Sequence, residues 1–268
     1  MTPVRDLTEA PGRVPMLALD DITVRFAGIT ALAGVSLSVD AGEVCGLIGP
    51  NGAGKTTLFD VVSGVRRPEH GRVVMDGEDI SALGPPARCW RGVRRTFQRV
   101  QTFGWLTVED NVLAATEWRG GGGGLLADLV MLPTRRRRER ERRALVAEAL
   151  DRCGLTAVRS EYAGSLPIGI GRMVEFARAT VEPPRLLLLD EPASGLDAEE
   201  AARLGEQIRS VRERTGCAVL LVEHNAGFIM QHSDRVVVLA LGAVLADGSP
   251  AEIQADPLVR SAYLGGEA

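Results

Sequence analysis

The sequence predicts an α/β fold, and three of its features carry that prediction. Short apolar runs typical of buried strands, such as residues 44–48 and 186–189, are separated by segments with helical spacing of apolar residues. A glycine-rich loop follows the first of these runs and leads into a helical pattern over residues 55–62. The length of 268 residues allows one large domain with an insertion or two small ones, and because nothing repeats internally we expect a single domain over residues 17–248.

The first part of the chain is expected to contain several short strands. Residues 1–16 are rich in proline and glycine and are expected to form a flexible leader. In the strand-rich segment 17–86, residues 22–26 and 72–80 have the composition of strands. The pair Asp76-Gly77 interrupts the latter, and such a pair is typical of a two-residue hairpin turn.

The second part is expected to be mostly helical before core strands return. Residues 87–181 are predicted to form a helical subdomain, and residues 182–248 to supply further strands and helices of the core. The tail, residues 249–268, opens with a serine, a proline and then Glu252, which is typical of a capped helix start. We therefore expect the chain to end in a helical tail.

Composition excludes several classes of function. The 35 acidic and 31 basic residues give a net charge of −4, so no overall positive field attracts nucleic acid. The apolar stretches are shorter than the ~20 residues that span a bilayer, and no apolar signal core follows a basic start. The four cysteines, Cys45, Cys89, Cys153 and Cys217, show neither paired nor metal-ligand spacing. These features predict a reduced, cytoplasmic protein that binds no nucleic acid.

One motif gives the first positive indication of function. Of the 31 basic residues only Lys55 is a lysine, and it lies in GPNGAGKTT, which fits the pattern of a phosphate-binding P-loop after a strand. Glycines let backbone N–H groups turn toward phosphates, and a lysine is a compact charge that reaches the β- and γ-phosphates. The alternative, a chance match of a glycine turn, is expected in about one such chain in a hundred. The predicted nucleotide ligands in this motif are Asn51, Gly52, Ala53, Gly54, Lys55, Thr56 and Thr57.

Two acidic residues indicate that the bound nucleotide is hydrolysed. The run RLLLLDEP ends a predicted buried strand in Asp190, which is suited to hold Mg²⁺ through water, and Glu191 comes next, where a carboxylate can polarise the attacking water. A strand that merely happens to end in acids is the alternative. Guanine recognition by an N-K-x-D element needs a second lysine, and none remains. ATP is therefore the predicted nucleotide.

On these residues the chain resembles the ATP-binding subunits of ABC transporters, from about residue 17 to residue 265. The resemblance implies a P-loop NTPase core of ABC ATPase type, with an antiparallel β subdomain and a helical subdomain. It also implies that Phe26 stacks on adenine, that Gln98 ligates Mg²⁺ and senses the membrane subunit, and that His224 contacts the γ-phosphate. Without the resemblance, Phe26 fits equally well as a core aromatic and His224 as a structural histidine.

Two further family motifs differ in how well they match. Residues 194–197 read SGLD and match the D-loop, and Asp197 also has the spacing of a capping box with Glu200. The signature, commonly L-S-G-G-Q, reads LPIGI here and retains only Leu166 and Gly169, which we predict to contact the facing subunit's ATP. The alternative is a turn containing Pro167 before a helix over residues 171–181.

An insertion in the predicted helical subdomain indicates which group of ABC transporter subunits the chain resembles. Residues 120–124 are five glycines, and residues 135–143 hold seven arginines and two glutamates, within an insertion at about 119–145. We favour a solvated helix face, with Glu139 and Arg143 paired, over contact with anionic lipid headgroups. Together with the GVRRTFQ, EHN and AYLG segments, the insertion makes the chain similar to the first ATP-binding subunit of branched-chain amino acid importers. Relatives that import amides or urea, or export lipopolysaccharide, are similar as well.

This resemblance implies cofactors, partners and a location. ATP and Mg²⁺ are the expected cofactors, and a second ATP-binding subunit is the expected partner, in a heterodimer or a homodimer. Two membrane permease subunits and, indirectly, an extracytoplasmic solute-binding protein complete the predicted importer, which places the chain peripherally on the cytoplasmic face of the membrane. A soluble ABC protein of translation or DNA repair, and a regulatory module that binds ATP without hydrolysing it, are the alternatives.

The segment after Gln98 is a candidate for contact with the permease. Residues 99–106 read RVQTFGWL, and an exposed apolar patch at that point favours docking of a short permease helix. The alternative is that Phe103 and Trp105 pack inside the helical subdomain.

Overall fold

The computed structural model describes residues 14–116 and 133–264, and their elements confirm the predicted α/β class. The leader expected over residues 1–16 and the five glycines at 120–124 lie wholly or mostly outside the described residues. The chain divides into two compact units. We call residues 1–98, 184–194 and 208–268 the core unit, and residues 99–183 and 195–207 the helical unit.

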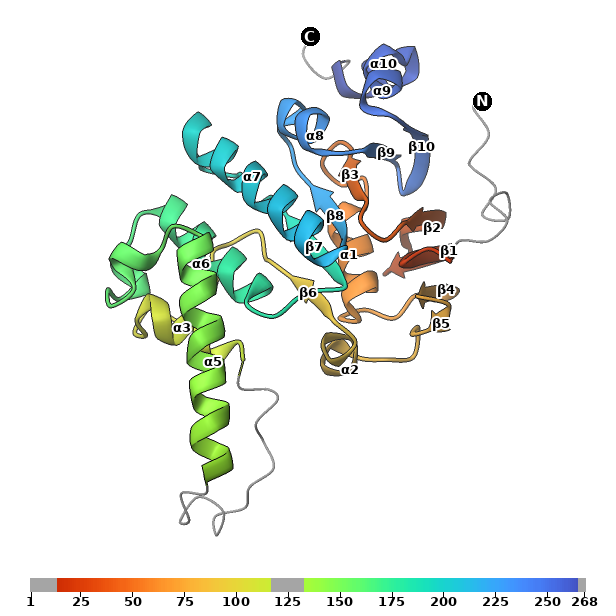
Figure 1. Cartoon of the computed structure of the whole chain (residues 1–268). Coiled ribbons are helices and arrows are strands. Elements are labelled where there is room, and N and C mark those ends of the chain that lie inside the picture. The colour runs from red at the N-terminus through yellow and green to blue at the C-terminus, as the bar shows by residue number, and fades with distance from the viewer. Residues whose placement is uncertain (1–13, 117–132, 265–268) are drawn as a thin grey trace. The chain divides into compact units, whose positions relative to one another are not determined.

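A six-stranded sheet forms the centre of the core unit. Its order is β10 (Ala243–Gly248), β9 (Arg235–Ala240), β3 (Val44–Ile48), β8 (Ala218–Val222), β7 (Leu186–Asp190) and β6 (Val93–Arg95). The strands from β9 to β6 pair in parallel, while β10 is antiparallel to β9. Every residue of β3, β7 and β8 is buried, as expected of parallel strands covered on both faces. The three lie side by side in Figure 1.

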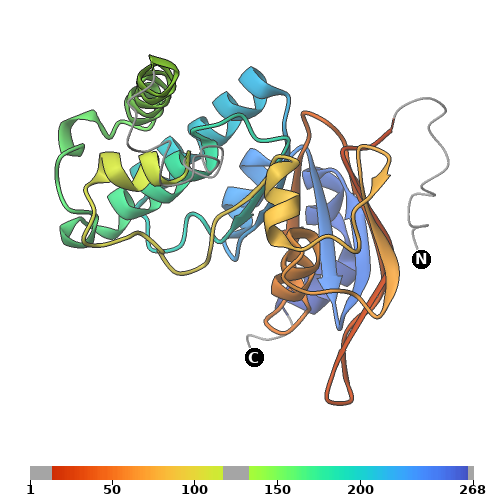
Figure 2. The ribbon, with the colours of Figure 1, turned by 90° about the horizontal axis from the view of Figure 1, so that it is seen from below.

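A second, antiparallel sheet of four strands completes the β structure of this unit. Its order is β2 (Ile29–Val39), β1 (Leu17–Phe26), β4 (His70–Met75) and β5 (Glu78–Asp79). The hairpin of β1 and β2 is drawn in red at one edge of the unit in Figure 2. The turn predicted at Asp76-Gly77 is confirmed: both residues have positive φ, and β4 and β5 pair on either side of it.

Helices make up the rest of both units. The core unit contains α1 (Lys55–Ser63), α2 (Pro85–Trp90), α8 (Ala226–His232), α9 (Pro250–Ala255) and α10 (Pro257–Leu264). The helical unit contains α3 (Val108–Ala114), α5 (Pro133–Arg152) and α6 (Ile168–Thr180), with short 3₁₀ turns at Thr156–Val158 and Ala163–Ser165. Helix α7 (Ala198–Thr215) runs from the helical unit into the core unit. The capped start predicted for α9 is confirmed by a reciprocal capping box between Ser249 and Glu252.

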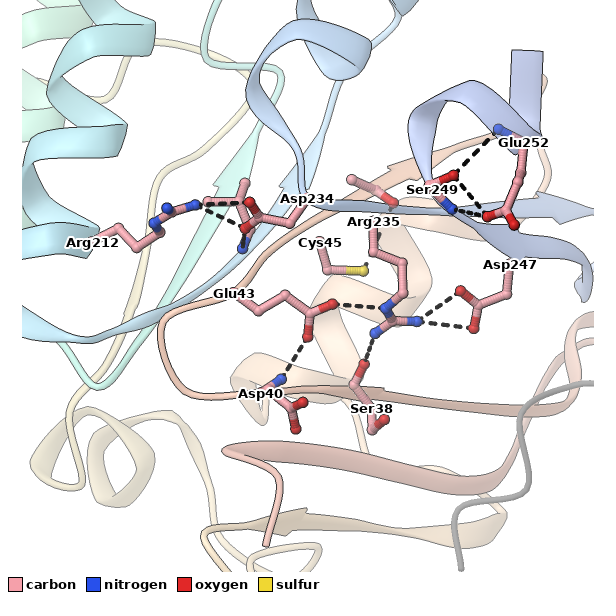
Figure 3. A network of polar contacts seen from close by, with 12 residues as sticks. Ser38, Asp40, Glu43, Cys45, Arg212, Asp234, Arg235, Asp247, Ser249 and Glu252 are labelled. Carbon is pink, nitrogen blue, oxygen red and sulfur yellow. Dashed lines mark hydrogen bonds and ion pairs between the residues drawn. The ribbon is translucent and has the colours of Figure 1, made fainter. Parts of the chain in front are cut away.

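A half-buried ion-pair network ties the two sheets of the core unit together, as Figure 3 shows. Arg235 of β9 donates to Glu43 at 2.7 Å and to both oxygens of Asp247 in β10, and it also bonds the carbonyl of Ser38 in β2. Glu43 in turn accepts the N–H of Asp40 at 2.7 Å. The network lies at the start of β3, whereas the glycine-rich loop follows the end of that strand.

Candidate functional site

The glycines of the loop between β3 and α1 give it its shape. Gly52 and Gly54 have φ angles of +79° and +103°, which residues with a side chain rarely adopt. A Cβ atom on Gly49 would lie 2.2 Å from the carbonyl oxygen of Leu239, so only glycine fits there. Ala53 is buried beneath the loop. The backbone is thereby free to turn its N–H groups toward a bound anion.

Lys55 begins α1 and lies almost wholly inside this loop. Its side chain is 7% exposed, and its Nζ donates to the carbonyl oxygens of Gly49 at 2.6 Å and Pro50 at 3.1 Å. Burial lowers the pKa of its ammonium, while the nearby Glu191 and Asp190 carboxylates oppose that shift. The remaining side chains predicted to bind nucleotide here are exposed or half-buried: Asn51, Thr56 and Thr57. A helix start with a lysine in this position favours a phosphate ligand.

Asp190 ends β7 and is held by an arginine that sequence reasoning did not assign to the site. Arg95 at the end of β6 donates to Asp190 at 3.2 Å, to Asp60 at 2.6 Å and to Ser63 at 3.0 Å. Burial raises the pKa of Asp190, and Arg95 counteracts the rise. The sequence offered one indication of this role, because the arginine lies only three residues before Gln98, a predicted site residue.

Glu191 is the meeting point of the predicted catalytic side chains. One carboxylate oxygen of Glu191 accepts a hydrogen bond from the Nε2 of Gln98 at 3.0 Å. The other oxygen lies 2.7 Å from the Nε2 of His224. Its φ angle is +49°, which is unusual for a residue with a side chain, and its N–H donates to Val222 in β8 at 2.9 Å. Gln98, Glu191 and His224 therefore converge, although they lie more than 30 residues apart in the chain.

The residue before His224 is a buried acid that sequence reasoning also missed. Glu223 is 3% exposed and directly follows β8. Its Oε1 accepts the N–H of Ala193, and its Oε2 accepts the N–H of His224 at 3.2 Å. Burial raises the pKa of Glu223, and the charge of Glu191 adds to the rise. Its only signal in the sequence was the acidic residue within the EHN segment.

Phe26, at the end of β1, presents its ring at the surface of the core unit. The side chain is 38% exposed, and the guanidinium carbon of Arg66 lies 4.1 Å from the ring centroid. An aromatic ring that stacks on one planar cation has a face suited to a planar base. Its stacking on adenine stays a prediction.

The signature residues lie in the helical unit. Helix α6 begins at Ile168, three residues before the start predicted at 171, and Pro167 is its N-cap. Leu166 precedes the helix in an extended conformation, and a Cβ on Gly169 would lie 2.0 Å from the Oε1 of Glu200. The predicted D-loop capping box is confirmed, because the N–H of Asp197 donates to Glu200 at 3.1 Å and the N–H of Glu200 to Asp197 at 2.8 Å.

Two other predicted features also belong to the helical unit. Helix α5 carries (i, i+4) ion pairs between Arg137 and Glu141 at 2.8 Å and between Glu139 and Arg143 at 2.9 Å, as a solvated helix face would. The rings of Phe103 and Trp105 lie 6.0 Å apart and are 38% and 76% exposed. Trp105 is therefore at the surface rather than in the core of this unit.

The donor set of the core unit fits a magnesium ion. Thr56, Gln98 and Asp190 offer a hydroxyl, an amide and a carboxylate, and oxygen ligands are those that Mg²⁺ prefers. Among residues 14–116 and 133–264 there is no cluster of three or more His, Cys, Asp or Glu side chains that could hold a metal. One carboxylate with a hydroxyl suits an ion that is completed by phosphate oxygens and water. Within the same described ranges, no helix is long and apolar enough to cross a membrane.

A P-loop after a buried parallel strand, with an Asp-Glu pair at the end of a second one, defines a nucleoside triphosphatase. The family description "ABC transporter" matches residues 32–194, and "Branched-chain amino acid ATP-binding cassette transporter" matches residues 243–268. The chain belongs to the ABC transporter family, as an ATP-hydrolysing subunit of its branched-chain amino acid transporter group.

Individual relatives agree with this assignment. The chain is 41% identical to the high-affinity branched-chain amino acid transport ATP-binding protein BraF of Pseudomonas aeruginosa, over 94% of this chain and 98% of that protein. It is 37% identical to LivG of Escherichia coli strain K12, described in the same words, with the same coverage. A crystal structure of a nucleotide-free ATP-binding cassette from an ABC transporter superposes with a TM-score of 0.81 at 28% identity, over 93% of this chain and 99% of that one.

Proposed function

We propose that this ATPase powers the uptake of branched-chain amino acids and hydrolyses ATP at the site formed by the core unit. The observation that supports this most is the convergence of Gln98 and His224 on the two oxygens of Glu191. Each contact orients the carboxylate, which is then placed to accept a proton from an attacking water. A group fixed in this way loses little entropy when the reaction begins.

The loop and α1 would bind the phosphates near this carboxylate, since the Lys55 ammonium interacts with Glu191. Lys55 contributes the charge, and the backbone N–H groups of the loop contribute the hydrogen bonds. Thr56, Asp190 and Gln98 would hold Mg²⁺, which neutralises charge on the phosphates when it is bound. The exposed ring of Phe26 would stack on the adenine.

The partners of this subunit follow from its family. The chain would act with two permease subunits and, through them, with an extracytoplasmic solute-binding protein, at the cytoplasmic face of the membrane. Phe103 and Trp105 expose apolar surface directly after Gln98, and this patch would receive a short permease helix. A second ATP-binding subunit would supply the signature helix that completes the ATP site.

The altered signature favours a heterodimer with unequal sites. Pro167 offers neither a hydroxyl nor an N–H where a serine would supply both. Loss of one donor to a charged ligand costs about 1.5 to 3 kcal/mol. Because a signature acts on the ATP of the facing subunit, the site built on Lys55 and Glu191 would be the more active one when the partner has an intact signature.

The experiment that tests the proposed site is Glu191→Gln. This variant should bind ATP like the wild type and form a stable closed dimer, while its turnover falls at least about 100-fold because the base is lost. Glu213→Gln, which changes an exposed glutamate of α7, is the matched control and should hydrolyse ATP normally. Turnover of Glu191→Gln near the wild-type rate would show that Glu191 is not the base.

A second experiment tests the solute. The chain, its partner cassette and the permeases would be reconstituted in lipid vesicles with ATP inside and the binding protein outside, and uptake of labelled leucine, urea and a short amide compared. ATP-dependent accumulation of leucine alone supports the proposal. ATP binding without turnover in the assembled wild-type complex would instead support the regulatory module considered above.

A further inference from the structure

Glu223 uses both of its carboxylate oxygens on the backbone of the active site. The Oε1 accepts the N–H of Ala193 at 2.5 Å, and the Oε2 accepts the N–H of His224 at 3.2 Å. Ala193 lies two residues after Glu191, in a turn closed by a bond from the N–H of Ser194 to the carbonyl of Glu191 at 3.2 Å. One buried side chain thus connects the loop that carries Glu191 to the loop that carries His224.

The geometry of Glu191 shows why such a connection matters. Its backbone has a φ of +49°, a conformation that persists only where the surroundings hold it. The bond from its N–H to Val222 fixes the start of the turn, and the bond from Ala193 to Glu223 fixes the part that follows. Val222 and Glu223 are adjacent at the end of β8, so this strand end holds the turn at two points.

We propose that Glu223 is a positioning residue, whose carboxylate sets the distance between Glu191 and His224 so that both can act on the same γ-phosphate and water. The inference rests on the roles proposed for those two residues. A carboxylate is suited to this task because both of its oxygens only accept hydrogen bonds. Glutamine keeps the length of the side chain but replaces one acceptor with an NH₂ group, which opposes a backbone N–H.

Burial next to Glu191 is otherwise unfavourable for an acid. The side chain is 3% exposed, and the proximity of Glu191 and the loss of water both disfavour its charged form. The hydrogen bonds to Ala193 and His224 offset part of that cost.

The test compares Glu223→Gln with Glu43→Gln. Glu43 is a matched control because it also accepts a backbone N–H, that of Asp40, within the half-buried polar network of Figure 3. It precedes β3, whereas Glu223 follows the parallel strand β8, so the two glutamates lie at opposite edges of the sheet. Amide hydrogen exchange is measured in the nucleotide-free protein, ATP affinity by fluorescence titration, and kcat by phosphate release. Melting temperatures are recorded for all variants.

Glu223→Gln should speed exchange at the amides of Ala193 or His224 by at least about tenfold and lower kcat by about 10- to 100-fold, with ATP affinity changed less than threefold. Glu43→Gln should lower the melting temperature yet leave kcat unchanged. In a His224→Ala background, the same Glu223 substitution should lower kcat less than about threefold, because the distance between Glu191 and His224 no longer affects the reaction once His224 is absent.

Three results would overturn the proposal: a wild-type kcat in Glu223→Gln, a kcat loss of equal size in Glu43→Gln, or a full multiplicative loss in the His224→Ala background. Failure of the proposed function is recognised separately. In that case Glu191→Gln retains turnover, whatever the Glu223 variants do.

Discussion

Replacement of Arg95 by methionine tests how the buried charges of the site are held together. Methionine has a similar length and no charge, so the change removes the guanidinium while filling most of its volume. The arginine side chain is 9% exposed and that of Asp190 is 5% exposed. The variant therefore leaves the Asp190 carboxylate buried without its ion-pair partner. The Lys55 ammonium still interacts with that carboxylate and offsets part of the loss.

The size of the effect follows from this burial. Breaking a buried ion pair by removal of one partner typically costs about 3 to 5 kcal/mol, whereas an exposed pair contributes at most about 1 kcal/mol. Asp60, the other partner of Arg95, is 28% exposed and can be solvated by water, so we expect the lower end, about 3 kcal/mol.

The loss should depend on pH in a defined direction. Burial already raises the pKa of Asp190 in the folded protein, and removal of Arg95 raises it further. A carboxyl with a raised folded pKa is protonated in the folded state at acid pH and imposes no charge penalty there. The penalty grows as the pH rises from the unfolded pKa to the folded one. Arg95→Met should thus be less destabilising at pH 5 than at pH 8.

Urea denaturation of both proteins at the two pH values measures this difference. The free energy of unfolding should fall by about 3 kcal/mol at pH 8, and a second change, Asp190→Asn, should recover part of that loss because it removes the unpaired charge. The same loss at pH 5 and pH 8, or a loss below about 1 kcal/mol at pH 8, would refute the reasoning.

Further predictions concern single side chains. Lys55→Ala should abolish measurable ATP binding in a filter assay, and unchanged affinity would contradict the role of the loop. Trp105→Ala should weaken co-purification with the permeases and transport while leaving ATP binding and melting temperature intact, since its ring is 76% exposed; a large fall in melting temperature would instead indicate a packing role. Cys45 is fully buried beside Arg235, and burial raises the pKa of its thiol to about 12. This thiol should therefore resist iodoacetamide at pH 8 until the protein unfolds. The half-buried Cys89 should react first.

Local features of the fold could be predicted from the sequence because their cause is local. The Asp76-Gly77 turn and the capping boxes at Asp197 and Ser249 depend on residues at most three positions apart. Each is set by backbone geometry that the neighbouring residues determine.

The start of α6 was placed too late for a physical reason. The sequence predicts a turn containing Pro167 before a helix that begins at Gly171, and Gly169 within that turn disfavours a helix. In the structure both are helical, and each gives room to a close neighbour: Glu200 beside Gly169, and Val100 at 3.1 Å from a Cβ on Gly171. Tertiary packing there outweighs intrinsic propensity.

Arg95 and Glu223 were missed because their partners are distant in the chain. Arg95 meets Asp190 only through the pairing of β6 with β7, and Glu223 meets Ala193 only because β7 lies beside β8. A strand order is needed before either contact can be expected, and no spacing in one segment indicates it.

The two carbonyl bonds of Lys55 have a consequence for the rate of nucleotide capture. The Nζ of Lys55 donates hydrogen bonds to the carbonyl oxygens of Gly49 and Pro50, so the backbone of the loop curves around the ammonium group. A phosphate meets a preorganised cradle, so little chain entropy remains to be lost on association. Nucleotide binding would then be an exchange of hydrogen-bond partners, in which the ammonium leaves the carbonyl oxygens of Gly49 and Pro50 and bonds to phosphate oxygens instead. The lysine that we propose to bind the nucleotide would thus also hold its own loop in place between turnovers.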